Sequence, residues 1–218
     1  MFAYPKQAEV NRPLPKNKIY EHAKPSRAVR NHFVKQVAEI VWKYKLSPET
    51  INLPARQGVE EIQIFEIALR TPELGEDVLR AIDKAIPSPI VFDLVFDGRI
   101  RTTAAYKRPS EGDSSRSVVD AYFETAWKPA AAARPPLPLA LDLAGLYEQM
   151  LCDLMAVPRR PAEPLRPYVE RVNLIRTKLA ECVRLETRIK REVQFNRKVE
   201  LNAQLRLRRA ELADLRKP

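Results

Sequence analysis

The spacing of hydrophobic and polar positions changes along the chain, and each change marks an expected element. Apolar side chains recur at helical spacing over residues 26–46, which predicts a helix that Ser47-Pro48 brings to an end. Residues 50–53 then have the composition of a short strand. A strong strand is expected over residues 59–69, where the alternation slips, which indicates a β-bulge or burial on both faces. A second helix begins at Thr71-Pro72-Glu73.

The clearest short-range pattern predicts a β-hairpin in the middle of the chain. Residues 90–96 predict a strand with Ile90, Phe92, Leu94 and Phe96 on one face, and Asp97-Gly98 supplies the residue types of a type I′ turn. The return strand runs from Arg99 to about Lys107, and residues 118–127 predict a further strand. Together with the preceding helices, this order predicts an α+β domain, a small and mostly antiparallel sheet with helices on one face.

The end of the chain predicts a long amphipathic helix or a helix pair, of coiled-coil type. Alternating steps of three and four residues keep a narrow apolar seam facing a partner helix. The seam consists of Leu165, Tyr168, Val172, Ile175, Leu179, Cys182, Ile189 and Val193. A new seam starts at Leu201, so we expect a bend or a change of partner over residues 195–202. The pattern leaves open whether the seam packs within the chain, on a second copy or on another protein.

Proline is frequent and glycine scarce, with 19 and 5 residues, and the prolines cluster in segments that read as arms and linkers. The expected organisation is an extended Pro-rich arm (1–25), an α+β domain (26–128), a Pro/Ala linker (129–140), a helix (141–157), a Pro-rich joint (158–167) and a basic amphipathic C-terminal helix or helix pair (168–218).

The net charge of +10 is concentrated at the C-terminal end. From Leu165 onward there are fifteen Lys and Arg against seven Asp and Glu, which gives +8. Such a local excess favours an anionic partner, either nucleic acid or an acidic protein face. The alternative is a solvated helix surface stabilised by i,i+4 ion pairs. The candidate nucleic-acid-binding residues are Lys43, Lys45, Lys107, Arg108, Arg188, Lys190, Arg191, Arg197 and Lys198.

No motif predicts catalysis, a cofactor or a metal site. The sequence has no Gly-rich phosphate loop and no Gly-x-Ser-x-Gly elbow, and its two histidines lack other ligands at metal-binding spacing. Cys152 and Cys182 lie in apolar helical patterns, as small core residues of a reducing compartment do. No run approaches the ~20 apolar residues of a membrane span, and no signal-peptide pattern is present, so we expect a cytoplasmic protein without membrane contact.

A metal-dependent nuclease is the enzymatic alternative. Restriction-type cores place an acid on one strand and an acid-x-Lys pattern on the next, so that two carboxylates hold Mg²⁺ beside a lysine. The hairpin offers Asp93 or Asp97, but Ala105 occupies the position of the second acid before Lys107. Such a site could be completed only by a rearrangement that uses Glu60, Glu61 or Glu66.

Four stretches resemble a bacterial domain-of-unknown-function family. They are Val41-Trp42-Lys43-Tyr44-Lys45-Leu46 with Glu49-Thr50-Ile51-Asn52-Leu53, then Tyr106-Lys107, then Leu141-Asp142-Leu143-Ala144-Gly145-Leu146-Tyr147, and the distinctive run from Arg191 through Gln194-Phe195-Asn196-Arg197-Lys198 to Asn202. Members of this family are typically encoded beside SNF2-type helicases and DNA methyltransferases in restriction-like or anti-phage clusters. The family has no established catalytic residues, so none is transferred to this chain.

The resemblance implies an accessory subunit in a DNA-acting defence assembly, and it marks the bend as a recognition feature. The candidate partner-binding residues are therefore the seam residues Ile175, Leu179, Ile189 and Val193 and the neighbouring Gln194, Phe195, Asn196 and Asn202. Our leading hypothesis is a non-enzymatic subunit that bridges DNA and a helicase or methyltransferase. The alternatives are a self-associating coiled-coil scaffold, which would be a homodimer through the C-terminal helix, and the degenerate Mg²⁺-dependent nuclease.

Overall fold

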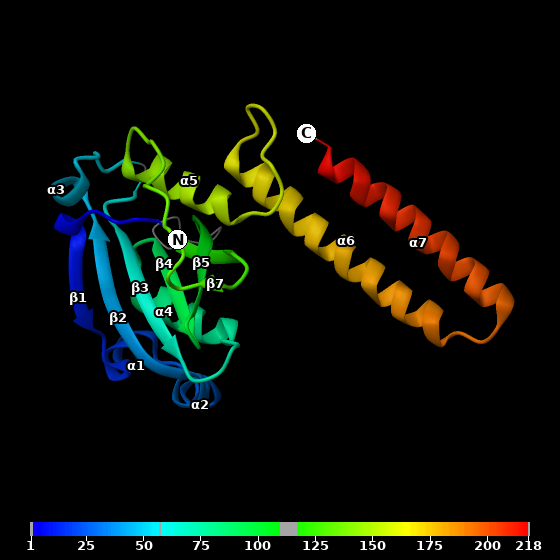
Figure 1. The fold of residues 1–218 in the computed structure, drawn as a ribbon, viewed down its shortest axis with the longest axis horizontal. Helices are drawn as coiled ribbons and strands as arrows, with labels where there is room; N and C mark the ends of the chain where they lie inside the picture. Colours follow the sequence, from blue (N-terminus) through cyan, green and yellow to red (C-terminus); the bar gives the residue numbers. More distant parts are fainter. Residues whose placement is uncertain (1, 57, 110–116, 218) are drawn as a thin grey trace. The chain divides into compact units, whose positions relative to one another are not determined.

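The structure is a computed structural model that describes residues 2–56, 58–109 and 117–217. The chain forms two compact units, Met1–Met155 and Ala156–Pro218. The elements of the first unit are η1 (Lys6–Ala8), β1 (Glu9–Pro13), α1 (Lys16–Ala23), α2 (Arg27–Gln36), β2 (Val37–Leu46), α3 (Pro48–Ile51), β3 (Ile62–Leu69), α4 (Glu76–Ala85), β4 (Ile90–Phe96), β5 (Arg99–Pro109), β6 (Ser117–Glu124), β7 (Lys128–Pro129) and α5 (Leu143–Leu154) (Figure 1). The second unit contains α6 (Leu165–Arg191) and α7 (Phe195–Arg216).

The first unit is built on a mixed sheet whose described strands run in the order β1-β2-β3-β4-β5-β6, with β7 pairing on β5. Only the β3–β4 pair is parallel among these, and α4 makes the crossover between the two strands. The expected α+β class and the mostly antiparallel sheet are confirmed. The β4-β5-β6 meander is also confirmed, and Asp97 and Gly98 take the positive φ angles of 46° and 67° that a type I′ turn requires.

The sheet is buried on both faces, which the expectation of helices on one face did not include. One core joins α1, α2 and α4 to alternating sheet residues such as Phe65, Ile67 and Phe92. The residues that alternate with these, among them Ile64 and Val91, are equally buried but lie outside that core. Helix α5 packs against β5 and β6 and buries its own apolar side chains, Leu143, Leu146, Met150 and Leu151.

The helix expected over residues 26–46 is wrong beyond Gln36. Helix α2 ends there, and the chain continues directly as β2, which pairs with β1 and β3. Register shifts between Val37 and Glu39 and between Trp42 and Tyr44 mark irregularities in this strand. Each bulge adds a residue to the strand and interrupts its period of two, so buried positions such as Val37 and Ile40 fall three residues apart and imitate a helix.

Two further segments differ from expectation. The arm expected over residues 1–25 contains the edge strand β1 and helix α1, whose Ile19 and Ala23 belong to the core. The strand expected over residues 50–53 is replaced by the short helix α3, because Ser47 and Thr50 form a reciprocal capping box around its N-terminus. The backbone N–H of Ser47 donates to the Thr50 hydroxyl at 2.8 Å.

The second unit is an antiparallel helical hairpin (Figure 1). Helices α6 and α7 are joined by residues 192–194, immediately before the stretch where a bend was expected. The two expected seams meet each other, since Tyr168, Val172, Ile175 and Cys182 of α6 and Leu201, Leu205 and Leu212 of α7 are all buried. The hairpin therefore packs its main apolar seam within the chain.

Candidate functional site

The end of the hairpin near its turn is the strongest candidate for a binding surface, and the pattern of ion pairs identifies it. In the body of the hairpin, acids of one helix neutralise cations of the other. Lys178 pairs with Glu211 at 2.8 Å, and Arg208 pairs with Glu181 at 3.1 Å. Cross-helix pairs of this kind fix the register of α6 against α7 and offer little charge to an external ligand.

Nearer the turn, cations outnumber acids. Residues 184–198 contain six Lys and Arg against two acids, a net charge of +4 in a stretch of fifteen residues. Glu186 is engaged by Arg209 at 2.9 Å, and Glu192 lies 3.6 Å from Arg197. Of the six cations in residues 184–198, all of which the structure describes, five make no ion pair: Arg184, Arg188, Lys190, Arg191 and Lys198. All five are exposed, so this positive charge is available to an anionic partner.

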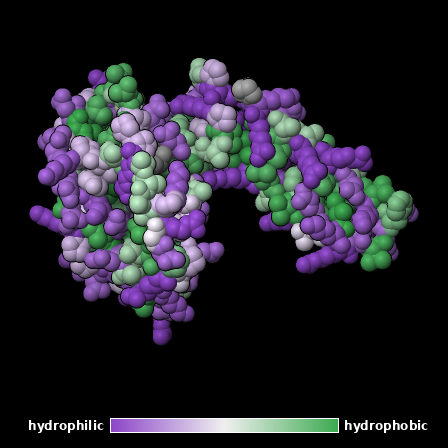
Figure 2. Space-filling model, in the orientation of Figure 1, coloured by the Kyte–Doolittle hydropathy of each residue, from purple (hydrophilic) through white to green (hydrophobic). Residues whose placement is uncertain are grey.

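Exposed apolar side chains interrupt these cations. Val193 is 94% exposed, Phe195 77% and Val199 48%. Figure 2 shows hydrophobic surface at the turn of the hairpin, bordered by hydrophilic side chains. We call the six cations Arg184, Arg188, Lys190, Arg191, Arg197 and Lys198, together with Val193, Phe195 and Val199, the tip surface. Large exposed apolar groups among cations are typical of a contact surface and not of a merely solvated helix.

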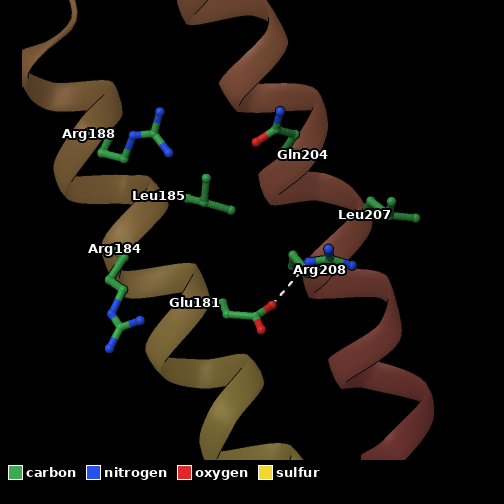
Figure 3. Close-up of a pocket in the computed structure, with 7 residues that line it drawn as sticks. All are labelled: Glu181, Arg184, Leu185, Arg188, Gln204, Leu207 and Arg208. Carbon is green, nitrogen blue, oxygen red and sulfur yellow. Dashed lines mark ion pairs between the residues drawn. The ribbon is translucent and has the colours of Figure 1, made fainter.

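A groove of about 270 Å³ between the two helices continues the tip surface towards the body of the hairpin. It is lined by Glu181, Arg184, Leu185, Arg188, Gln204, Leu207 and Arg208. Figure 3 shows Leu185 and Arg188 projecting from α6 towards α7, and the Glu181–Arg208 ion pair crossing the groove. The groove is therefore closed by an ion pair on its body side and is bordered by unpaired arginines nearer the turn.

The predicted partner-binding residues fall into two groups. Ile175 is only 2% exposed and belongs to the hairpin core, so it contacts α7 and has no free surface to offer. Ile189 is half-buried, and Leu179 is 37% exposed. Val193 and Phe195 belong to the tip surface, and the predicted Gln194, Asn196 and Asn202 are also exposed. The Asn202 side-chain amide donates to the Lys198 carbonyl at 2.7 Å, one turn earlier on α7.

The cations predicted to bind nucleic acid in the first unit are already engaged by acids. Lys45 lies 2.8 Å from Glu61, and Lys43 lies 3.9 Å from Glu66. Lys107 lies 2.8 Å from Asp83, and its side chain is 9% exposed, too deep to reach an external phosphate. Arg108 lies in β5, and its side chain is outside the described residues. The five cations predicted in the second unit, in contrast, all lie on the tip surface.

The nuclease arrangement around the β4–β5 hairpin is not assembled. Asp93 is paired across the strands with Thr102, whereas Lys107 contacts Asp83 of α4 on the other face of the sheet. Glu66, one of the acids that the rearranged site would use, does lie beside Asp93, because the two residues are neighbours on the parallel strands β3 and β4. Among the described residues, no group of three or more His, Cys, Asp or Glu is placed to hold a metal ion. No helix of the described residues is long and apolar enough to cross a membrane.

Sequence reasoning missed Arg184, and the signal for it was present. Arg184 lies one helical turn before Arg188 on α6, so the two guanidinium groups share a face. What could not be read from the sequence is which cations would be neutralised, because the pairing partners lie on the opposite helix.

Comparison with known proteins places the chain in a family. Residues 2–212 match the domain of unknown function DUF4391. The chain belongs to this family. The match spans both units, so the sheet domain and the hairpin are parts of one family architecture. No curated protein and no solved structure matched the chain.

Proposed function

We propose that this DUF4391 protein is a non-enzymatic accessory subunit that joins a protein partner to DNA through the tip surface of its hairpin. The observation that supports the proposal is the segregation of charge in the hairpin. The body cations Lys178 and Arg208 form cross-helix ion pairs, whereas five of the six cations around the turn form no ion pair and are exposed. Free cations on a rigid support exchange readily for the counterions of a phosphate backbone.

The partner in this proposal is a helicase or DNA methyltransferase of a bacterial defence assembly, the context that the resemblance to the family implies. The contact surface for it is the apolar part of the tip surface, since the main seam is occupied within the chain. Phe195 and Val193 project from the turn, where an apolar pocket on a partner can receive them. The same cations then contact DNA held beside the partner.

The homodimeric scaffold is not favoured by this geometry. A coiled-coil dimer through the predicted seam would need Ile175 and Leu205 on a free surface, and both are buried in the hairpin of a single chain. Self-association through the tip surface would bring like charges together, which costs free energy.

The test measures binding of a labelled DNA duplex by fluorescence anisotropy at salt concentrations between about 50 mM and about 200 mM. Over this range, binding through phosphates weakens steeply. The variant replaces Arg188, Lys190, Arg191, Arg197 and Lys198 with Gln. We expect this variant to lose most of its affinity and most of its salt dependence.

The matched control removes five exposed cations from the first unit, with Gln at Lys6, Arg12, Lys24, Lys35 and Lys84. It lowers the net charge by the same amount and should bind DNA much as the unmodified protein does. Equal reductions of affinity in the two variants would show that binding follows total charge alone and would contradict the proposal. Light scattering with and without duplex adds a second readout, since a monomer that gains mass with DNA only at low salt is expected.

A further inference from the structure

A second pocket, of about 340 Å³, lies in the first unit. It is lined by Phe2, Ala3, Tyr4, Lys43, Tyr44, Glu66, Asp93 and Arg134. Five separate parts of the sequence meet there: the N-terminal segment, strands β2, β3 and β4, and the Pro/Ala segment before α5. The N-terminal segment is held in place by a backbone hydrogen bond from the Ala3 N–H to the Pro135 carbonyl at 2.7 Å.

Two carboxylates form the floor of this pocket. Glu66 and Asp93 are register partners on the parallel strands β3 and β4, so their side chains leave the same face of the sheet side by side. Asp93 is 3% exposed, and one of its carboxylate oxygens accepts the Thr102 hydroxyl at 2.6 Å. A carboxylate offers about four lone-pair sites, so accepting hydrogen bonds is compatible with holding a metal ion.

Two cations form ion pairs with these carboxylates, over distances longer than those of strong charge-assisted hydrogen bonds. The Lys43 ammonium lies 3.9 Å from a Glu66 oxygen, and an Arg134 guanidinium nitrogen lies 3.5 Å from an Asp93 oxygen. Charge-assisted hydrogen bonds in proteins are usually ~2.8 Å long. The four groups are formally neutral together, but the acids and the cations remain separable by a ligand.

Tyr4 supplies an independent indication that the pocket takes a ligand. Its hydroxyl oxygen is shielded from solvent and has no hydrogen-bond partner among the described residues. A buried hydroxyl without a partner costs free energy, which a ligand oxygen in the pocket would recover.

We propose that this pocket binds a divalent metal ion, Mg²⁺ or Mn²⁺, together with a phosphate monoester. Glu66 and Asp93 hold the metal ion, and Lys43, Arg134 and the Tyr4 hydroxyl hold the phosphate oxygens. Mg²⁺ sites in proteins commonly use one or two carboxylates and leave the remaining positions to water and substrate phosphate, so two acids are sufficient. The neighbouring rings of Tyr4 and Tyr44, with centroids 4.8 Å apart and planes tilted by 36°, form an aromatic wall for the group that carries the phosphate.

Charge balance distinguishes joint binding of the metal ion and the phosphate from binding of the metal ion alone. A divalent cation with a phosphate dianion is neutral overall, so the pair enters a neutral pocket without leaving net charge in a half-buried site. Either component alone would leave an uncompensated charge. The metal ion and the phosphate should therefore bind cooperatively, and each should raise the affinity of the other by the same factor.

The experiment titrates the full chain with MnCl₂, follows bound metal by electron paramagnetic resonance, and repeats the titration with saturating AMP or adenosine. We expect AMP to tighten Mn²⁺ binding at least about 5-fold, the lower end of typical coupling, and adenosine to leave it unchanged. Replacing AMP with a 5′-phosphorylated oligonucleotide distinguishes a free nucleotide from a nucleic-acid end as the source of the phosphate. Mn²⁺ affinity that AMP does not change would overturn the proposal.

Three variants assign the roles. Glu66→Gln should weaken Mn²⁺ binding at least about 10-fold, as loss of a ligand or its support does. Lys43→Gln should keep metal binding but lose the effect of AMP. Glu60→Gln removes an exposed carboxylate outside the pocket and is the control that should change neither. Thermal unfolding shows whether each variant is folded, and wild-type affinity in a folded Glu66→Gln variant would contradict the assignment.

This site is independent of the hairpin. The tip-surface variant with five Gln substitutions should bind Mn²⁺ and AMP as the unmodified protein does. The Glu66→Gln variant should bind duplex DNA with unchanged affinity. Each proposal can therefore fail without the other.

Discussion

Arg171 donates two parallel hydrogen bonds to the carboxylate of Glu163, from Nε to Oε1 at 2.8 Å and from Nη2 to Oε2 at 2.7 Å. The same guanidinium donates to the Pro158 carbonyl at 3.0 Å and to the Leu215 carbonyl at 3.2 Å. One buried arginine of α6 thus joins the Pro-rich segment before the helix to the end of α7. The base of the hairpin is closed at this point, which holds the turn at the other end in a defined geometry.

The ion pair at the base predicts how the stability of the hairpin depends on pH. The two hydrogen bonds from Arg171 lower the pKa of Glu163 from 4.5 to about 2. Because the folded pKa is depressed, the stabilisation is present above the unfolded pKa and is lost as the pH falls from about 4.5 towards 2. Glu163→Gln should destabilise the hairpin by about 2 kcal/mol at neutral pH, and by much less at pH about 2, as measured by thermal unfolding. Glu170→Gln, which removes an exposed i,i+4 partner of Arg166, is the control and should cost little at either pH.

The buried ion pair between Lys107 and Asp83 predicts a large destabilisation when only one partner is removed. Asp83 also accepts a hydrogen bond from the Tyr122 hydroxyl, and burial raises the pKa of its carboxyl. Lys107→Ala should destabilise the first unit by about 3–5 kcal/mol in chemical denaturation at neutral pH, because a buried carboxylate is left without its counter-charge.

Acid should partly rescue that variant. Protonation removes the uncompensated charge, and the folded pKa of Asp83 is raised, so the variant should regain stability relative to the unmodified protein as the pH falls. Lys84→Ala removes an exposed lysine of the same helix as Asp83 and should change stability by less than about 0.5 kcal/mol. An effect as small in Lys107→Ala would show that Lys107 is not needed to neutralise Asp83.

Exposed and buried apolar residues of α7 should separate binding from folding. Leu205 packs in the hairpin core, so Leu205→Ala should cost about 2–5 kcal/mol of stability. Phe195→Ala should leave the unfolding temperature nearly unchanged, because its side chain is 77% exposed. If Phe195 contacts a partner, the same variant should weaken that complex in a pull-down with the helicase or methyltransferase partner that we propose. A Phe195→Ala variant that unfolds early would place this ring in the fold instead.

Single substitutions on the tip surface should change the salt dependence of DNA binding in equal steps. Removing one cation that contacts a phosphate reduces the slope of log K against log salt concentration by about 0.9 for duplex DNA. Lys198→Gln and Arg188→Gln should each give about this change, measured by anisotropy across a salt series. Arg208→Gln is the comparison, since Arg208 is held by Glu181 and Glu211 and should leave the slope unchanged.

The sequence by itself determined the features that depend on local periods and turn chemistry. Asp97-Gly98 fixed the β4–β5 hairpin, because few residue pairs accept two positive φ angles in succession. The apolar steps of three and four fixed the amphipathic faces of α6 and α7. The excess of cations near Arg188 and Lys198 was also visible, since charge is a property of composition.

Tertiary structure decided everything that depends on which distant residues become neighbours. The residues around Ile40 have helical spacing but form a bulged strand, because cross-strand hydrogen bonds outweigh local propensity. Parallel pairing of β3 with β4 set Glu66 beside Asp93, across a crossover whose register no local pattern reveals. In the hairpin, the alignment of α6 with α7 selected which cations are neutralised. The charges can be read from the sequence, but folding alone determines which of them are available to a partner, because an ion pair forms only when both residues are brought together.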